Sequence, residues 1–280
     1  MKKPTISEAS KTAGRFANNK FVKLVSLFLL VLFCFIIGKQ SIEILIIILI
    51  TILVHELGHY SLMYKFGWNP TMLFAYGGAC VIPRAKPTQT TFGQEFYSVL
   101  AGPGMNGISA LICALFFWSN PLALPFVALN SLIGILNLGV GPILDGGHLF
   151  NLSVDNVKTK SQKALVTLLH SPFIFLIVPV IFYFFRGNLF WTTVAFTASI
   201  WFIYDAYKVD SLTAMENGGS FTPQTGMKKT LIGIANQYIV LAILVLSPII
   251  VLERLGKLNL AINLIIVELY KLGILKYIHF

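Results

Sequence analysis

Residues 41–60 read SIEILIIILITILVHELGHY, an apolar run that ends in two histidines and a carboxylate. A helix of about 20 residues crosses the roughly 30 Å hydrocarbon core of a bilayer. Because lipid offers the backbone no hydrogen-bond partners, runs of this length are expected to be helices and not strands. Apolar runs fall at 22–38, 41–63, 95–117, 122–144, 164–185, 189–206 and 231–252, and a mixed segment follows at 258–278. We therefore predict an all-α polytopic membrane protein with six to eight transmembrane helices.

The composition agrees with a chain that faces lipid. Of the 280 residues, 56% are hydrophobic and only 11% are charged, whereas a soluble domain has about 25% charged residues to cover its surface. A disordered chain is excluded by the same figures. The three cysteines have no paired or CxxC spacing, so we expect neither a disulfide framework nor a cysteine metal site.

We interpret the distribution of the net charge of +10 as an indication of which loops face the cytoplasm. If the seven clear runs alternate across the membrane, one side receives the N-terminal segment as far as Lys23 and the loops near 64–94, 151–163 and 207–230, with six, three, three and three basic residues. The other side receives four: Lys39, Arg186, Arg254 and Lys257. The positive-inside rule then predicts a cytoplasmic N-terminus. We exclude nucleic acid as a partner, because no basic helix or aromatic platform accompanies the charge.

A second kind of element is predicted between the second and third membrane helices. The segment from Phe66 through Pro83 combines turn residues with apolar ones, and strand-like structure is plausible there at 70–85. We predict that this segment forms a re-entrant β-hairpin, with a packed cytoplasmic loop as the alternative.

The histidines of the opening stretch form an HExxH motif of His55, Glu56 and His59. Residues four apart lie on one face of a helix, so both imidazoles can bind one metal ion while Glu56 projects beside them. Ionisable groups are costly inside a membrane and are usually functional there. The alternative is a pair of buried histidines hydrogen-bonded to a neighbouring helix.

A catalytic zinc site uses three protein ligands, so one more ligand is expected in an apolar setting. Asp145 is the candidate, within NLGVGPILDGGH at 137–148. Pro142 cannot continue a helical hydrogen-bond ladder, and the flanking glycines permit close backbone approach. We therefore expect the helix to break here and to turn Asp145 inward.

Together these motifs resemble the site-2 protease family of intramembrane zinc metalloproteases. The resemblance rests on HELGH at 55–59, on Asn137 followed by Pro142 and the Leu144-Asp145-Gly146 triplet, and on AGPGMN at 101–106. It implies one Zn²⁺ per chain held by His55, His59 and Asp145, with Glu56 as general base and then general acid. It further implies that Asn137 touches the substrate backbone or the developing oxyanion.

The resemblance covers about residues 41–150, which we take as the catalytic core of a membrane metalloprotease domain at 22–252. A basic cytoplasmic segment at 1–21 precedes this domain. An apolar segment at 253–280 follows it, and either spans the membrane or lies at its interface. We find no segment that matches a PDZ or CBS domain, so we expect a minimal core.

Four further residues are weaker candidates. His148 and Asn106 are expected to lie directly behind the ligands, where His148 can orient one of them and Asn106 bridges helices. Gly77 and Gly78 belong to the predicted hairpin, whose edge we expect to pair with an unwound substrate as an added strand.

The sequence thus predicts a zinc-dependent intramembrane endopeptidase that acts on membrane-anchored protein or peptide substrates. His55 lies about 21 Å along a helix that starts on the outer side of a roughly 30 Å core, so the active site is expected toward the cytoplasm. The alternative from another class is a metal or ion transporter that uses the same cluster. An inactive relative that only binds membrane proteins is a third reading. No feature of the sequence indicates an oligomeric state.

Overall fold

The computed structural model describes residues 41–75, 78–83, 90–141, 144–175 and 226–271. The predicted helices at 22–38 and 189–206 and the basic segment at 1–21 lie outside these ranges, as does the second half of the predicted span at 164–185. Most of the described chain is helical, and it contains one two-stranded sheet. In chain order the elements are α3 (Ile42–Lys65), β1 (Pro70–Ala75), β2 (Gly78–Pro83), α4 (Phe92–Phe116), α5 (Ala123–Leu138), α6 (Asp145–Asp155), α7 (Lys160–Phe175), α10 (Gly226–Arg254) and α11 (Leu258–Lys271).

Three of the described helices, α3, α4 and α10, are long and apolar enough to cross a membrane. The prediction of six to eight spans is not confirmed, because the described residues supply three candidates by length and composition. α5 is apolar but has only 16 residues. It is shorter than the predicted run at 122–144, since the chain leaves the helix after Leu138.

α3 exposes large apolar side chains along one face and buries several polar side chains among apolar ones on the other. Its exposed face carries a large apolar residue every three or four positions: Ile42, Ile46, Ile50, Leu53 and Leu57. Its buried face carries Thr51, His55, Glu56 and His59. α10 follows the same rule, with Ile232 and Ile239 exposed and Thr230 and Gln237 buried. Polar groups inside and apolar groups outside are what a lipid-facing bundle requires.

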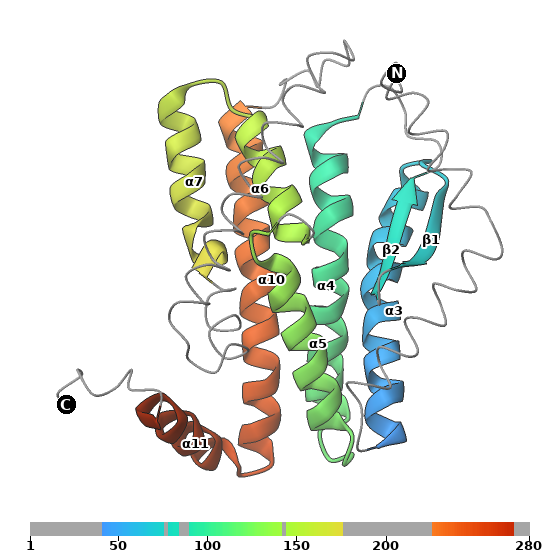
Figure 1. The fold of residues 1–280 in the computed structure, drawn as a ribbon, viewed down its shortest axis with the longest axis vertical. Coiled ribbons are helices and arrows are strands. Elements are labelled where there is room, and N and C mark those ends of the chain that lie inside the picture. The colour runs from blue at the N-terminus through green and yellow to red at the C-terminus, as the bar shows by residue number, and fades with distance from the viewer. Residues whose placement is uncertain (1–40, 76–77, 84–89, 142–143, 176–225, 272–280) are drawn as a thin grey trace, which may run out of the picture.

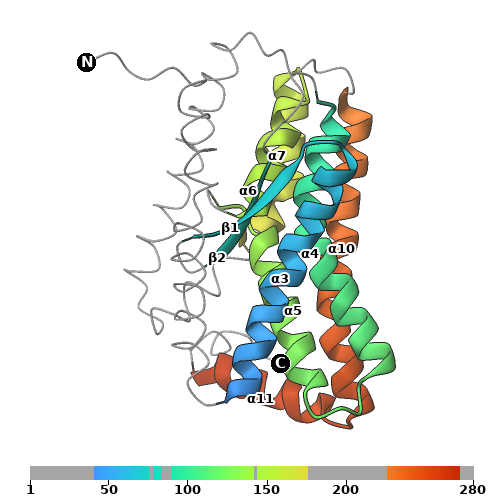
Figure 2. The ribbon, with the colours of Figure 1, turned by 90° about the vertical axis from the view of Figure 1, so that its right-hand side faces the viewer.

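α4 occupies the centre of the bundle and contacts α3, α5 and α10. Figure 1 shows α4 and α10 running in the same direction, with α3 on one side and α7 on the other; Figure 2 shows the hairpin lying across α3. α4 starts with a capping box, in which Thr91 and Gln94 satisfy each other's backbone N–H groups. Its first turns carry Phe92, Phe96 and Leu100 into the largest apolar cluster, where they meet Leu138 and Leu244.

Two predicted boundaries are wrong. The stretch at 151–163, taken as a loop, continues helix α6 as far as Asp155 before a short turn leads to α7 at Lys160. α10 begins at Gly226, earlier than the predicted start at 231, since the polar residues Lys228, Lys229 and Thr230 extend the helix beyond its apolar run. An apolar run marks the part of a helix that faces lipid, whereas the helix itself can continue past it.

The predicted hairpin is present between α3 and α4. β1 and β2 pair antiparallel, with Pro70 opposite Pro83, Met72 opposite Val81 and Ala75 opposite Gly78. Its re-entrant position in a membrane stays a prediction.

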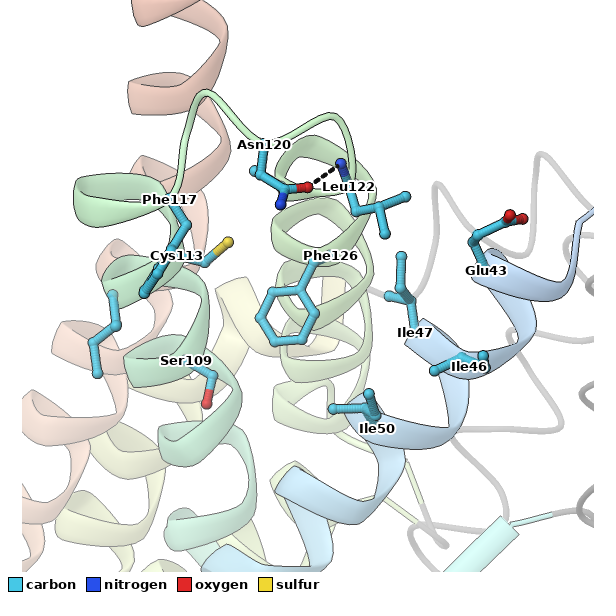
Figure 3. A pocket seen from close by; sticks show the side chains of 12 residues that line it. Glu43, Ile46, Ile47, Ile50, Ser109, Cys113, Phe117, Asn120, Leu122 and Phe126 are labelled. Atoms are coloured by element: carbon cyan, nitrogen blue, oxygen red, sulfur yellow. Dashed lines mark hydrogen bonds between the residues drawn. The ribbon is translucent and has the colours of Figure 1, made fainter.

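A wide apolar cavity of about 560 Å³ opens at the end of the bundle where α3 starts. Figure 3 shows Ile47 and Ile50 of α3 facing Phe117, which follows the end of α4, across Phe126 of α5. None of the predicted site residues lines it. The site residues lie further along α3, beside the hairpin.

Candidate metal centre

Three predicted ligands meet at one point between α3 and the start of α6. The Nε2 atoms of His55 and His59 are 3.2 Å apart. Asp145 Oδ2 lies 3.1 Å from His55 Nε2 and 3.3 Å from His59 Nε2. These three residues form a group that could hold a metal ion.

Hydrogen bonds on the far side of each imidazole fix its orientation. His59 Nδ1 lies 2.8 Å from the backbone oxygen of Ser98. A carbonyl oxygen can only accept, so this nitrogen carries the proton and Nε2 presents its lone pair. His55 Nδ1 lies 2.6 Å from Oδ1 of Asn106, which leaves its Nε2 free in the same way. Both rings are thus arranged as metal-ligating histidines usually are.

The donor set and its dimensions fit zinc. A tetrahedral zinc ion with ligands at about 2.1 Å separates its ligand atoms by roughly 3.4 Å, and the three separations are 3.1, 3.2 and 3.3 Å. Asp145 Oδ2 is buried, and within the described residues it has no hydrogen-bond partner besides the imidazoles that it faces. Three electron-pair donors directed at one point are stabilised by a cation between them.

The break between α5 and α6 brings Asp145 to the site. α5 ends at Leu138, and α6 starts at Asp145 with Leu144 as its N-cap. The N–H of Val140 donates to the backbone oxygen of Phe173 in α7, and this bond ties the segment between α5 and α6 to α7. A Cβ on Gly146 would lie 2.0 Å from the oxygen of Leu138, so only glycine allows α6 to start this close to the end of α5. The predicted break and inward turn of Asp145 are confirmed.

The close approach of α3 and α4 leaves room for the imidazoles and for little else. A Cβ on Gly102 of α4 would lie 2.2 Å from His59 Nε2 and 2.8 Å from His55 Nε2. A Cβ on Gly58 of α3 would lie 2.2 Å from the oxygen of Ala101. The two glycines therefore set the helix spacing at the level of the ligands.

Glu56 lies beside the ligands and against the hairpin. Its side chain is buried, and its carboxylate faces the backbone N–H of Val81 in β2. Oε2 is buried without a hydrogen-bond partner from the described residues. The carboxylate is thus held in place while one of its oxygens remains available.

These groups line a cavity of about 320 Å³. Its wall consists of the HExxH residues, Asp145, one strand of the hairpin and parts of α4, α5 and α6: His55, Glu56, His59, Met63, Ala79, Cys80, Val81, Val99, Asn137, Asp145 and His148. Asn137 reaches the cavity from α5 while its Nδ2 donates to the oxygen of Ile133. His148 lies one turn after Asp145 and is exposed.

Two of the remaining candidates, Asn106 and Gly78, do not line the cavity. Asn106 touches His55, in addition to the helix-bridging role expected from the sequence. Gly78 starts β2 and pairs with Ala75 across the hairpin, and Gly77 lies outside the described residues.

Sequence reasoning missed three contributors: the backbone oxygen of Ser98, the space at Gly102 and the backbone N–H of Val81. Two of these are main-chain groups, which any residue type supplies, so no sequence signal marks them. Gly102 lies within the AGPGMN stretch, and its position opposite an HExxH helix could have indicated a close helix contact.

Comparisons of the chain with protein-family models, with curated proteins and with solved structures found no match. The case for a function therefore rests on the residues of this site.

Proposed function

We propose that the protein is a zinc-dependent intramembrane endopeptidase of the site-2 protease type, which cleaves membrane-anchored substrates in or near a transmembrane helix. The observation that carries the proposal is the meeting of His55, His59 and Asp145 beside the buried carboxylate of Glu56. Two of these ligands and Glu56 belong to α3, a helix that is long and apolar enough to cross a membrane.

His55, His59 and Asp145 would hold one zinc ion per chain. Zinc in such a site is a Lewis acid that acidifies water and polarises a carbonyl group. The cavity of about 320 Å³ on the hairpin side gives a peptide bond and a water molecule room beside the three ligands.

Glu56 is the group that moves the proton. Its carboxylate accepts a proton from the attacking water and then donates it to the leaving amine. The carboxylate is buried and lines the cavity, where it faces the Val81 N–H. Asn137 is proposed to contact the substrate backbone with its amide, since it lines the same cavity from the opposite helix.

The free edge of β2 is the proposed docking place for an unwound substrate segment. Residue pairs in an antiparallel ladder alternate between hydrogen-bonded and non-hydrogen-bonded types. Pro70 and Pro83 lack N–H groups, so their pair is of the second type, and so by alternation are Met72 with Val81 and the pair that contains Ala79. The N–H and C=O groups of Ala79 and Val81 then point away from β1, toward the side that lines the cavity.

This direction is supported by the contact between the Val81 N–H and the Glu56 carboxylate. It leaves the C=O of Val81 and both backbone groups of Ala79 for a substrate strand, which would extend the sheet by β-augmentation. A helical substrate shields its carbonyls in its own hydrogen bonds, so pairing with an edge also holds the unwound form.

We further propose a multi-pass arrangement with a cytoplasmic N-terminus and the active site toward the cytoplasm. The distribution of basic residues supports this orientation. The site lies beside the hairpin, in the half of α3 that leads to the basic loop at 64–94.

The test is to purify the protein, measure its zinc content and assay cleavage of a reporter with one transmembrane helix, for wild type and Glu56→Gln. Glutamine keeps the shape but cannot take a proton, so we expect equal zinc in both and a loss of cleavage of at least about 100-fold in the variant. Cleavage by Glu56→Gln at the wild-type rate would exclude the mechanism.

The transporter alternative draws less support from the structure. A carrier needs further ionisable groups along its path. Outside the site, the buried ionisable side chains of the described residues are Glu95 and His170. Zinc-dependent ion flux that survives Glu56→Gln would favour the carrier.

A further inference from the structure

A fully buried polar network lies behind His55 and joins three helices. It consists of Thr51 on α3, Asn106 on α4 and Asn130 on α5, each with 0% exposure. Asn106 Nδ2 donates to the oxygen of Thr51 at 3.2 Å and to Oδ1 of Asn130 at 2.9 Å. Asn130 Nδ2 donates to Oγ1 of Thr51 at 3.1 Å and to the oxygen of Phe126 at 2.9 Å. All four amide hydrogens therefore have acceptors.

The network has one direction. An asparagine amide can be turned over, which exchanges its donor and its acceptor, unless its neighbours forbid it. The oxygen of Phe126 can only accept, so the NH₂ group of Asn130 must face it and Oδ1 must face Asn106. The NH₂ group of Asn106 must then face Asn130 and the oxygen of Thr51, and its Oδ1 must face His55.

An acceptor opposite Nδ1 of His55 requires the proton on that nitrogen. Nε2 then presents a lone pair toward His59 and Asp145. In His59 the same tautomer is fixed directly, because Nδ1 faces the backbone oxygen of Ser98. In His55, Nδ1 faces the side chain of Asn106. The backbone oxygens of Thr51 and Phe126 therefore fix its tautomer indirectly, through the amides of Asn106 and Asn130.

We propose that Asn130 is a positioning residue for the metal site, which acts through Asn106 to hold His55 in the tautomer that leaves Nε2 free for a metal ion. Asn130 touches neither the ligands nor the cavity wall. The inference rests on the metal-binding half of the proposed function and does not require peptidase activity.

The size of the effect follows from the number of bonds lost. Replacing a group that orients a metal-ligating histidine costs about 10- to 100-fold in metal affinity. Asn106→Leu removes the acceptor itself and is expected near the upper end of that range. Asn130→Leu is expected near the lower end, because the bond from Asn106 to the oxygen of Thr51 remains.

The matched comparison is Asn130→Asp. In an apolar setting the carboxyl group stays protonated, so its O–H can donate to Phe126 and its other oxygen can accept from Asn106. The direction of the network is kept, and we expect zinc affinity within about threefold of wild type. If Asn130 acted only through packing, zinc affinity would not depend on whether residue 130 offers an acceptor to Asn106.

Asn156→Leu is the control for the loss of a buried amide. Asn156 is 1% exposed and donates to Thr230 of α10. We expect this variant to lose thermal stability and to keep wild-type zinc affinity. If Asn130→Leu does not fold, Asn130→Ser replaces it, because a serine hydroxyl satisfies itself on the carbonyl four residues earlier and cannot reach Asn106.

Two measurements on the full-length protein in detergent test the proposal. Zinc affinity is measured by competition with a chelator. The histidine tautomer is read from ¹⁵N chemical shifts of the metal-free protein, at mildly alkaline pH, with the His55 signal assigned from its loss in His55→Gln. We expect an unprotonated Nε2 on His55 in wild type and Asn130→Asp, and a mixture of tautomers in Asn130→Leu.

An Nε2–H tautomer in wild type, or wild-type tautomer and zinc affinity in Asn130→Leu, would overturn the inference. If the wild type binds zinc with the expected series of affinities but cleaves no reporter, the inference stands and the peptidase proposal fails. If the wild type binds no zinc, the metal site itself fails, while the ¹⁵N spectra still decide the tautomer.

Discussion

Gly102 has no side chain that could bind a ligand, yet it limits the space at the candidate metal site. Gly102 packs against the Nε2 atoms of both candidate ligands, and an added methyl group would fill the space that the imidazoles occupy. The helices approach this closely because Gly58 removes a second Cβ from the same contact. The ligands are therefore enclosed by backbone, which cannot move aside as a side chain can.

Gly102→Ala is predicted to abolish zinc binding, because the new Cβ would overlap His59 Nε2. Gly104→Ala is the matched control, since a Cβ there meets nothing within 4 Å. Alanine at an open helix position stabilises by about 0.5–1 kcal/mol. Zinc content after dialysis and thermal unfolding check both variants, and a Gly102→Ala protein with full zinc would contradict the packing argument.

At this scale the HExxH residues were predictable, because ionisable groups stand out in an apolar run. Asp145 was predictable as well, since few carboxylates share that setting. Asn106 was predicted to lie beside the ligands and to bridge helices, but which ligand it contacts was not predicted. The bond to His55 depends on the rotation of α4 against α3, which the sequence of either helix leaves open.

At the scale of elements, the hairpin contributes to the site with its backbone. Alternation along the ladder directs Ala79 and Val81 outward from β2, and it directs Met72 outward from β1. Gly78 is opposite Ala75 in the hydrogen-bonded class of pairs, so its backbone groups are used within the hairpin. The edge that a substrate would meet is therefore formed by the residues after Gly78.

Ala79→Pro is predicted to lower the cleavage rate by about three- to tenfold, the effect of losing one edge hydrogen bond. Zinc content should not change. Met72→Pro, which removes the equivalent N–H from the outer edge of β1, is the control and should cleave at the wild-type rate. Equal losses in the two variants would indicate damage to the hairpin in place of a lost substrate contact, and an unaffected Ala79→Pro would exclude docking at this edge.

The break between α5 and α6 is the element-scale feature that the sequence predicted best. Proline and glycines interrupt the apolar run, and the helix ends at Leu138 as these residues require. The end of α6 was missed because the last turn of this helix contains polar residues. Such residues occur both at helix ends and in loops.

At the scale of the whole molecule, the described bundle has two distinguishable ends. The metal centre and hairpin lie toward the end where α6 leads into α7, and the α10–α11 turn lies at the opposite end (Figure 1). The apolar cavity beside Phe126 lies toward the α10–α11 end. The site thus lies in the half of the bundle that contains the α6–α7 turn, since it is formed by the second half of α3 and the start of α6.

The proposed orientation predicts which end faces the cytoplasm. In a background with Cys34, Cys80 and Cys113 replaced by serine, Lys257→Cys should react with a membrane-impermeant maleimide added to intact cells. Lys160→Cys should react only after the membrane is opened, because it lies at the basic end. The reverse labelling pattern would invert the topology and move the active site to the outer side.

The sequence by itself determined that this is a mostly helical chain with membrane-length apolar helices, and which ionisable residues could hold a metal. Both follow from local chemistry, because an apolar run and a charged group within it are recognisable without knowing what they contact. Only the tertiary structure decided that His55, His59 and Asp145 meet, that Gly102 leaves space for them, and that Asn130 lies behind His55. These depend on the spacing and rotation of four helices, α3, α4, α5 and α6, which are set by packing between residues far apart in the chain.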